Sequence, residues 1–583
     1  MPESVTDTHP TRADASERLF YFGFGALTLL LASLPYLYGW LTTPAGHVYT
    51  GFTYNIDDGA VYLAWMREAA RGQFTIHNPF SVELQKNVLF NLFFFLLGSV
   101  VRFTGLGAMV VYQAARVISG GLLLWGAAAL IRETLTSPTA RKAAFALVCV
   151  GAGLGWLWQI ASPEMGPVDL WQPEAITFLS LYFSPLFVAA MALMVVFLLS
   201  ALRWERGGGF KTLWPAMVSG ALLGNFHSYD VIHLFAVWFV YRVVSDIAAR
   251  RINWHGWLGF LAAGIATLPT TGYQAWALMI DPVFKERAFI SKTLSHPVYQ
   301  VLFGFGLLVP LAVCGVALPK RTERFISAEA LRLLVTWAIV GIAVAYIPIS
   351  FQRKMLMGAH IPWAILAGCG LVALASRLSG DFPKIVTAAV VALVLPSNAL
   401  FLNRDIGRLQ SNVGSTPHQP YLTNDEDKAL SWLRDNTKPS DNVLVGPDPT
   451  SHLRFPGNVL YPHLSVYVPA YAGNTVYDGH WSETAGFGKK LAKTVRFFRL
   501  ETDDAYRRDL LRENGIRYIL YVNALGNGPL KNAAGEILTD SSGTDPYFVP
   551  MPWPQSEVPP YLSPVYQNNE LTIFAVDAGK INP

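Results

Sequence analysis

Two adjacent carboxylates, Asp57 and Asp58, stand in the stretch TYNIDDGAVYLAWMREAARG, residues 53–72, just after the first long apolar segment of the chain. A carboxylate at this boundary could act as a general base. It would take a proton from an acceptor hydroxyl while that oxygen attacks an activated carbon. Partial burial would raise its proton affinity toward neutral pH, and a nearby cation would lower it.

A structural role is the alternative explanation for this acid pair. Asn55 or Asp57 would then cap a helix over residues 58–71 by accepting from free N–H groups of its first turn. Two aromatic residues, Tyr62 and Trp65, continue the same helix face at helical spacing. Because uncompensated charge at a membrane surface is costly, an acid pair with aromatic neighbours favours a cavity over a simple cap.

Cations that could hold an anion come later in the chain. In SFQRKMLMGAHIP, residues 350–362, Arg353 and Lys354 lie in a predicted outer loop. Arginine offers a planar fork for phosphate oxygens and lysine a compact charge, although anchoring to lipid headgroups is the alternative. Arg116 lies within a predicted membrane segment, where an arginine must be paired, line a wet cavity or snorkel to the surface.

Further polar groups fall in the predicted outer loops. The loop over residues 161–178 carries three acids and no basic residue, namely Glu164, Asp169 and Glu174. One of them could hold a divalent cation, Mg²⁺ or Mn²⁺, together with Asp57 or Asp58, although acids beside prolines are also common in turns. We expect a substrate pocket lined by aromatic and ionisable side chains of these loops: Tyr54, Tyr62, His77, Glu174, His227, Tyr229 and His360.

The segment YDGHWSETAGFGKK, residues 477–490, collects His480, Trp481 and Glu483 near the end of the chain. It has neither metal-ligand spacing nor a nucleophile elbow. We therefore expect these side chains to be structural or solvated. The sequence also contains no phosphate-binding Walker loop, no dinucleotide fingerprint and no internal repeat.

The composition is that of a membrane protein. Only 14% of the 583 residues are charged and 52% are hydrophobic, whereas soluble proteins carry about 25% charged residues. A membrane-crossing helix needs about 20 apolar residues. Apolar runs predict eleven spans, at residues 19–40, 109–131, 143–161, 184–202, 212–224, 231–246, 254–272, 298–318, 331–349, 361–376 and 385–402. The net charge of +4 is too small to indicate a nucleic-acid partner.

A shorter apolar stretch, NVLFNLFFFLLGSVV at residues 87–101, determines on which side of the membrane each later loop lies. If it does not cross and the N-terminus is cytoplasmic, the short cytoplasmic loops carry most of the basic residues, as the positive-inside rule requires. If it crosses, that bias reverses. We therefore expect it to lie along or dip into the outer face of a plasma (inner) membrane. The transmembrane domain would comprise residues 1–402, with its first outer loop at 41–108.

The polar tail, residues 403–583, is predicted to be a soluble extracytoplasmic α/β domain. Amphipathic and β-rich patterns alternate along it. Asn424 is expected to cap the first of its helices. The predicted helices are 424–436 and 503–515, the predicted strands are 442–446, 516–523 and 571–576, and the Pro- and Gly-rich segment 524–564 is expected to be irregular.

Taken in order, these features resemble the GT-C superfamily of integral membrane glycosyltransferases. The acid pair of IDDGAVYLAW is followed by a membrane-lying stretch, the arginine-bearing span YQAARVISG, the QRKMLMGAHIPWAILAGCG pattern and a soluble terminal domain. The resemblance implies an inverting transferase that takes a sugar from a polyprenyl-phosphate donor. Asp57 would be the general base, and Asp58 would orient the acceptor or bind metal. Arg353, with Lys354 or Arg116, would hold the lipid phosphate.

The resemblance leaves the acceptor and the branch of the superfamily open. HNPF stands where protein mannosyltransferases and aminoarabinose transferases have a His-Pro-Pro-Leu run, so the chain is distant from both branches. The acceptor could be a glycan, a lipid or a protein, and membrane lipids surround the chain. A transporter or flippase for a lipid-linked sugar is one alternative, although such proteins need mid-span ionisable groups or paired broken helices. A non-catalytic membrane scaffold is the other.

Overall fold

The computed structural model describes residues 12–162, 166–318, 325–451, 460–529, 536–537, 539 and 551–581. The chain divides into two compact units. Unit 1 comprises Met1–Leu34, Gln113–Gln274 and Lys292–Arg404, and unit 2 comprises Pro35–Tyr112, Ala275–Ser291 and Asp405–Pro583. Unit 2 thus combines the whole predicted first outer loop with nearly all of the predicted polar tail. Glu164, one of the three loop acids, lies outside the described residues.

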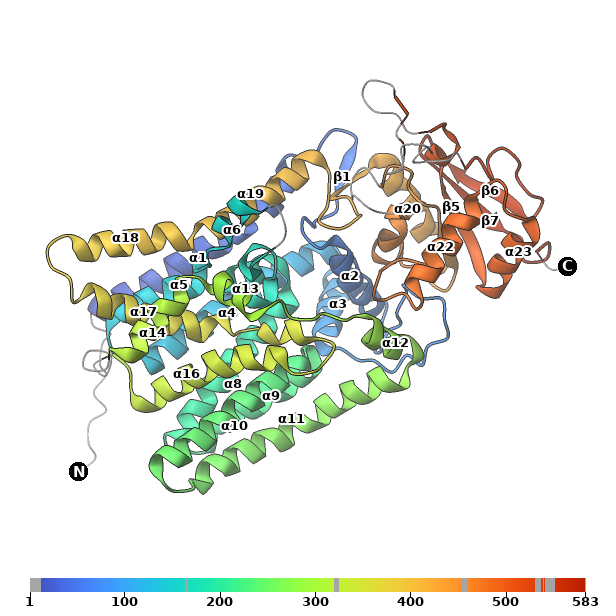
Figure 1. The fold of residues 1–583 in the computed structure, drawn as a ribbon. Coiled ribbons are helices and arrows are strands. Elements are labelled where there is room, and N and C mark those ends of the chain that lie inside the picture. Colours follow the sequence, from blue (N-terminus) through green and yellow to red (C-terminus); the bar gives the residue numbers. More distant parts are fainter. Residues whose placement is uncertain are drawn as a thin grey trace. The chain divides into compact units, whose positions relative to one another are not determined.

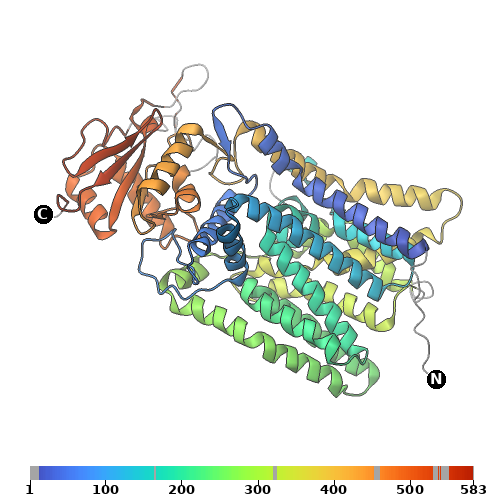
Figure 2. The same ribbon diagram turned by 180° about the vertical axis from the view of Figure 1, so that it is seen from behind.

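Long apolar helices make up most of unit 1 (Figures 1 and 2). The helices of the first outer loop are described below with unit 2. The other described helices before the polar tail are, in chain order, α1 (Arg12–Leu41), α4 (Ala108–Thr134), α5 (Pro138–Val150), α6 (Gly155–Ala161), α7 (Thr177–Phe183), α8 (Pro185–Glu205), α9 (Phe210–Phe226), α10 (Tyr229–Ala249), α11 (Trp254–Ile280), α12 (Pro282–Ile290), α13 (Val298–Phe305), α14 (Leu308–Ala317), α16 (Ala328–Ala343), α17 (His360–Ala375), α18 (Phe382–Val394) and α19 (Pro396–Ser411).

Membrane-spanning helices are confirmed as a class, and the predicted spans coincide with helices, although fewer than eleven helices meet the length and hydropathy needed for crossing. Within the described residues, seven helical segments are long and apolar enough to cross a membrane, or up to nine if two bent helix pairs each count as one span. The bent pairs are α5 with α6, at 41°, and α13 with α14, at 80°. With α9 and α11 included, each of the eleven predicted spans falls on a helix.

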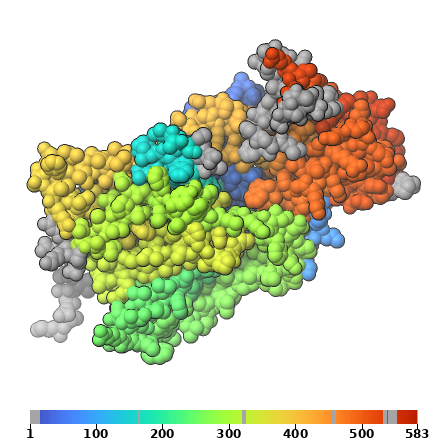
Figure 3. All heavy atoms as spheres, in the orientation of Figure 1, coloured from blue at the N-terminus to red at the C-terminus, as the bar shows by residue number. Residues whose placement is uncertain are grey.

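Packing of small residues brings the unit 1 helices close together. A Cβ added to Gly368 of α17 would lie 2.5 Å from the backbone of Ala144, and one added to Gly370 would lie 1.8 Å from the carbonyl oxygen of Leu311. Glycine is therefore needed where α17 crosses α5 and α14. α18, by contrast, lies at the surface, in the gold region of Figure 3. Its Phe382 and Ile385 side chains are exposed.

In unit 2, the first outer loop folds onto the start of the tail. Strand β1 (His47–Tyr49) pairs antiparallel with β2 (Tyr421–Thr423). Helix α2 (Ile56–Ala70) packs against α3 (Leu92–Thr104). α3 is a short apolar helix that contains most of the stretch 87–101, which was expected not to cross the membrane. At 1.5 Å per residue α3 is roughly 20 Å long, which is too short to cross a hydrocarbon core of about 30 Å.

The tail contains a five-stranded sheet with strand order β4-β3-β5-β7-β6. β3 is parallel to β4 and β5, whereas β7 is antiparallel to β5 and β6. Aromatic side chains, including Phe497, Phe498, Tyr521 and Phe574, form its hydrophobic core. The elements are α20 (Asn424–Asn436), β3 (Asn442–Val445), β4 (Thr475–Val476), α22 (Phe487–Phe498), α23 (Asp504–Glu513), β5 (Ile516–Val522), β6 (Leu562–Gln567) and β7 (Leu571–Val576).

The predicted helices and strands of the tail agree with the structure, with one local difference. Thr423, not Asn424, caps α20. The Thr423 hydroxyl accepts from the N–H of Glu426, and the Glu426 carboxylate accepts from the N–H of Thr423, which is a complete capping box. Much of the segment expected to be irregular lies outside the described residues, and its described end contains β6.

Candidate active site

The acid pair lies in the first turn of α2, which starts directly after Asn55. Asn55 has a positive φ of 51°, and its side chain caps no helix N–H. Instead the side-chain amide of Asn55 donates to Asp58 Oδ2. The backbone N–H of Asn55 donates to the hydroxyl of Ser415 at 2.7 Å. Acidic side chains are favourable near a helix N-terminus, where the helix dipole is positive, so this turn holds two carboxylates at one place.

The two carboxylates have different environments. The Asp57 side chain is 5% exposed, whereas that of Asp58 is 39% exposed. Asp57 Oδ1 is buried and has no hydrogen-bond partner among the described residues. Neighbouring carboxylates in unlike surroundings can take different protonation states, which is a recurring arrangement in acid–base catalysis.

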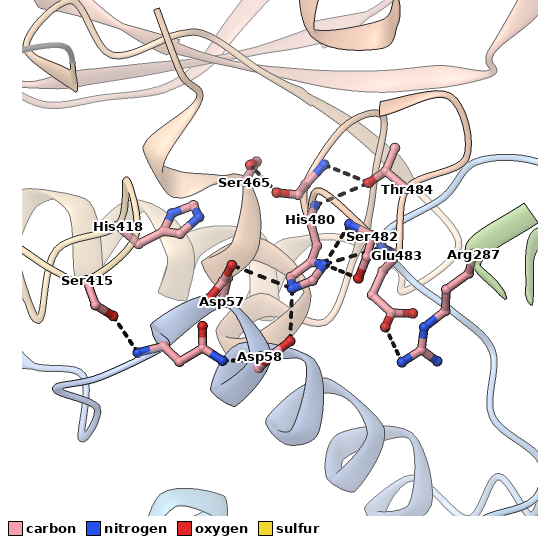
Figure 4. Close-up of polar contacts among 12 residues, drawn as sticks. Asp57, Asp58, Arg287, Ser415, His418, Ser465, His480, Ser482, Glu483 and Thr484 are labelled. Atoms are coloured by element: carbon pink, nitrogen blue, oxygen red, sulfur yellow. Dashed lines mark hydrogen bonds and ion pairs between the residues drawn. The ribbon is translucent and has the colours of Figure 1, made fainter. Parts of the chain in front are cut away.

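His480 lies against both acids, as Figure 4 shows. Its Nε2 is 3.3 Å from Asp58 Oδ1 and 3.7 Å from Asp57 Oδ2. The backbone N–H groups of Ser482 and Glu483 donate to Nδ1 at 3.1 and 3.2 Å. Because Nδ1 accepts these bonds, the proton of the neutral ring sits on Nε2 and faces the two carboxylates.

Burial and the acid–histidine contact set the proton affinities. Burial raises the pKa of Asp57 to about 6, although the charge of His480 acts in the opposite direction. Burial alone would lower the pKa of His480, but the hydrogen bond to Asp58 and the charges of both acids outweigh it and raise that pKa. Asp57 is therefore an acid whose titration falls near neutral pH, as a general base requires.

A second set of polar contacts fixes the loop that carries His480. Glu483 is buried and pairs with Arg287 of α12 at 2.7 Å, and the Asn78 amide donates to its backbone oxygen at 2.9 Å. The Thr484 hydroxyl donates to the carbonyl of Phe80 at 2.6 Å. Residues from the first outer loop thus hold the histidine loop above α2, within unit 2 (Figure 4).

The other predicted pocket residues of unit 2 occupy separate places. The Tyr62 ring stacks on Phe94 of α3 with centroids 5.0 Å apart. Arg408 lies over the Tyr54 ring, 5.5 Å from its centroid. His77 Nδ1 is 3.1 Å from the amide oxygen of Asn87. Their role as substrate contacts stays a prediction.

In unit 1, the later basic pair meets several of the predicted pocket residues. Arg353 Nε is buried, has no hydrogen-bond partner among the described residues, and lies 3.9 Å from Glu174 Oε1. The Arg353 guanidinium stands 5.1 Å from the centroid of Trp171. Lys354 Nζ is 5.1 Å from the centroid of Tyr229. Each of these two cations therefore lies over an aromatic ring, Arg353 over Trp171 and Lys354 over Tyr229.

The two predicted histidines of unit 1 are both buried. His227 Nδ1 lies 2.9 Å from Asp230 Oδ2, and its ring meets Tyr229 edge to face. His360 Nδ1 lies 2.8 Å from the Thr177 hydroxyl. These contacts fix the orientation of the two rings.

Arg116 makes a different set of contacts. It is 2% exposed and donates to the Gln113 side chain at 2.8 Å, to the Leu181 carbonyl at 3.0 Å and to the Ser33 hydroxyl at 3.0 Å. Such a guanidinium is satisfied by the protein itself. Arg353 and Lys354 are therefore the better candidates for binding an anion, although the sequence placed all three together.

His480 was expected to be structural or solvated, and the structure instead buries it against the acid pair. In the sequence of residues 477–490, the one pattern that could have indicated a site is a histidine and a glutamate three residues apart, His480 and Glu483. That signal could not identify the partner, because the acids lie far away in the chain. Asp57 belongs to unit 2 and Arg353 to unit 1, so a single pocket joining them stays a prediction.

No protein-family model and no curated protein matches the sequence. The oligosaccharyltransferase of Archaeoglobus fulgidus, solved in the apo form, matches with a TM-score of 0.55 at 12% identity, over 87% of this chain and 70% of that chain. The same enzyme, AglB, in complex with an inhibitory peptide and a dolichol-phosphate matches with a TM-score of 0.51 at 12% identity, over the same shares.

Two further matches extend the comparison. The Archaeoglobus fulgidus enzyme in complex with Zn and sulfate gives a TM-score of 0.53 at 12% identity, over 86% of this chain and 68% of that chain. ArnT from Cupriavidus metallidurans bound to undecaprenyl phosphate gives 0.47 at 14%, over 94% and 98%. The chain thus has the fold of the archaeal oligosaccharyltransferase, and the polytopic helical fold with a terminal soluble domain that the sequence resemblance implied is confirmed.

Proposed function

We propose that this chain is a membrane glycosyltransferase that moves a sugar from a polyprenyl-phosphate donor to a hydroxyl acceptor, with inversion at the reacting carbon. The observation that carries the proposal is the state of Asp57. It is a buried carboxylate with one oxygen free of partners among the described residues, a pKa of about 6 and a histidine beside its other oxygen.

The reaction follows from this geometry. Asp57 Oδ1 accepts the proton of the acceptor hydroxyl. The acceptor oxygen forms a bond to the sugar carbon as the bond from that carbon to the phosphate oxygen breaks. The electron pair of the broken bond leaves with the polyprenyl phosphate. Because the acceptor attacks from the face opposite the leaving phosphate, the configuration inverts.

Asp58 and His480 support the base in this scheme. Asp58 is partly exposed and contacts Asn55 and His480, so in this scheme its exposed part orients the acceptor. The proton on His480 Nε2 faces Asp57 Oδ2 and stabilises the carboxylate form. His480 is thus a positioning residue that acts through Asp57.

A lipid-linked phosphate fits the chemistry of the basic pair in unit 1. AglB has been solved with dolichol-phosphate, and ArnT with undecaprenyl phosphate. Arg353 and Lys354 would neutralise the negative charge that develops on such a leaving group. The acceptor class, whether glycan, lipid or protein, is not specified by these contacts. The proposed setting is the plasma (inner) membrane with a cytoplasmic N-terminus, as the basic loops favour.

A divalent cation is a further part of the prediction, since one AglB structure contains Zn and sulfate. Because Asp57 acts as the base in this scheme, Asp58 is the carboxylate of the pair that would bind one. His480 is a poor ligand, because its Nε2 carries the ring proton. Among the described residues, no group of three or more His, Cys, Asp or Glu side chains is arranged to hold a metal. The proposed mechanism therefore assigns its steps to the protein's own residues.

The proposal is tested with the full chain in proteoliposomes supplied with a polyprenyl-phosphate sugar labelled in the sugar. Label that moves to an acceptor hydroxyl while polyprenyl phosphate accumulates supports a transferase. Label that crosses the bilayer still attached to its lipid supports the flippase alternative and contradicts the proposal. If neither transfer nor flipping of the label occurs, the chain is better explained as a scaffold.

The pH dependence of transfer follows from the pKa of Asp57. The base works only when ionised, so kcat/KM should be constant at neutral pH and should fall tenfold for each pH unit well below about 6. Initial rates between pH 4.5 and 8 would test this. A rate that stays unchanged down to pH 4.5 would exclude Asp57 as the base.

Replacing Arg353 by Gln should lower kcat by roughly 10²-fold, because a fixed cation at a developing oxyanion is worth about that much. Arg353→Lys should keep part of the activity, since it retains the charge but loses the planar fork. Arg377→Gln, which removes an arginine between α17 and α18, is the matched control. Equal activity of Arg353→Gln and this control would contradict a role in phosphate binding.

A further inference from the structure

Unit 1 contains a cavity of about 510 Å³ between α1, α4 and α5. Its walls are apolar and include small residues such as Gly25, Gly121 and Ala128. Figure 2 shows α1 and α4 running alongside each other on this face of the unit. The arginines Arg18, near the start of α1, and Arg132, near the end of α4, lie at the same end of the cavity.

The absence of a side chain at Gly121 keeps the cavity open. A Cβ built on this glycine would meet nothing within 4 Å. Glycine in a helix interior costs roughly 0.5–1 kcal/mol relative to alanine, and no close helix contact at Gly121 explains that cost. Open space along a membrane helix is a place where a lipid chain can lie.

The described acids that adjoin the two arginines in the chain are paired elsewhere. Glu17, beside Arg18, is 3.5 Å from Arg141. Glu133, beside Arg132, is 2.8 Å from both Arg203 and Arg206. In the part of the chain that the structure describes, neither Arg18 nor Arg132 forms an ion pair. The apolar cavity therefore ends in two arginines that have no ion-pair partner among the described side chains.

The length of the cavity fits one leaflet. From Arg18 to Leu29, which also lines it, α1 rises roughly 16 Å at 1.5 Å per residue. Half of a hydrocarbon core of about 30 Å is about 15 Å. A lipid chain could thus follow α1 from the membrane surface to the bilayer centre, with its headgroup beside the two arginines.

We propose that this cavity is a binding site for an anionic phospholipid, with one acyl chain between α1 and α4 and the headgroup phosphate held by Arg18 and Arg132. Basic pockets between membrane helices bind anionic headgroups on the cytoplasmic side, where the positive-inside rule also places both arginines. The site is separate from the acid pair of α2, and the inference does not depend on the proposed transferase activity.

The experiment uses the purified full chain, stripped of lipid in detergent and titrated in native mass spectrometry. The probes are phosphatidylglycerol and phosphatidylcholine with identical acyl chains. The unmodified chain should bind phosphatidylglycerol roughly tenfold or more tightly than phosphatidylcholine, because each arginine near the surface attracts an anionic headgroup. Equal retention of the two lipids would overturn the proposal.

Two variants separate the site from general charge effects. Arg18→Gln with Arg132→Gln should abolish the preference, and Arg250→Gln with Arg251→Gln, which removes two exposed basic residues after α10, should leave it unchanged. Loss of the preference in both double variants would show nonspecific attraction and contradict a built site. Thermal melting of each variant shows whether the fold is retained.

A third variant tests the acyl-chain half of the site. Gly121→Leu places a side chain in the open space without a clash at Cβ, and leucine favours a helix more than glycine does. It should reduce phosphatidylglycerol retention severalfold with both arginines in place. Undiminished retention would overturn the assignment of the chain to this cavity. Preferential displacement by polyprenyl phosphate would overturn the choice of a phospholipid.

Discussion

Asp57→Asn is expected to lower sugar transfer by roughly 10²- to 10⁴-fold, because the amide cannot accept the proton of the acceptor hydroxyl. The shape of the side chain is nearly unchanged, so membrane insertion and the contacts of α2 should be retained. The effect should appear in kcat more than in KM, since the lost interaction is made during the chemical step. A transfer assay with saturating donor measures it.

The matched control for this variant is Asp509→Asn. Asp509 lies on α23, is half exposed and pairs with Arg512. A surface ion pair of this kind contributes little to stability, so transfer should stay at the level of the unmodified chain. If Asp57→Asn transfers sugar as fast as the control, Asp57 is not the base, and a scaffold or transporter becomes the better explanation.

His480→Gln is expected to lower transfer roughly tenfold at neutral pH and to move the acid limb of its pH profile upward. The charge of His480 opposes the effect of burial on Asp57. Without it, the pKa of Asp57 should rise above about 6, and a larger fraction of the base is then protonated at pH 7. Initial rates from pH 5 to 9 would show both the loss and the shift.

The shift in pH profile separates a positioning role from a structural one. His463→Gln, which replaces another buried histidine of unit 2, is the control. It should change stability without moving the acid limb, because the ion pair of His463 is with Glu426, and His463 is not among the groups that shift the pKa of Asp57. Raising the pH should restore much of the activity of His480→Gln. An unmoved acid limb in that variant would contradict the assigned role.

Local patterns allowed much of the secondary structure to be predicted. Each apolar run of suitable length falls on a helix, because a chain in hydrocarbon must satisfy its backbone groups internally. The tail strands at 516–523 and 571–576 were predicted from their β-rich composition and became β5 and β7. The cap of α20 was misplaced by one residue, since Thr423 and Asn424 are both good capping residues.

The sequence by itself determined the membrane class, the helix positions and the presence of an acid pair at a helix start. These depend on hydrophobic periodicity and on residues a few positions apart. Only the tertiary structure decided that His480 faces Asp57, that Arg116 is satisfied within the protein, and that Arg353 Nε has no hydrogen-bond partner among the described residues. Such contacts join residues far apart in the chain, and packing, not local propensity, brings them together.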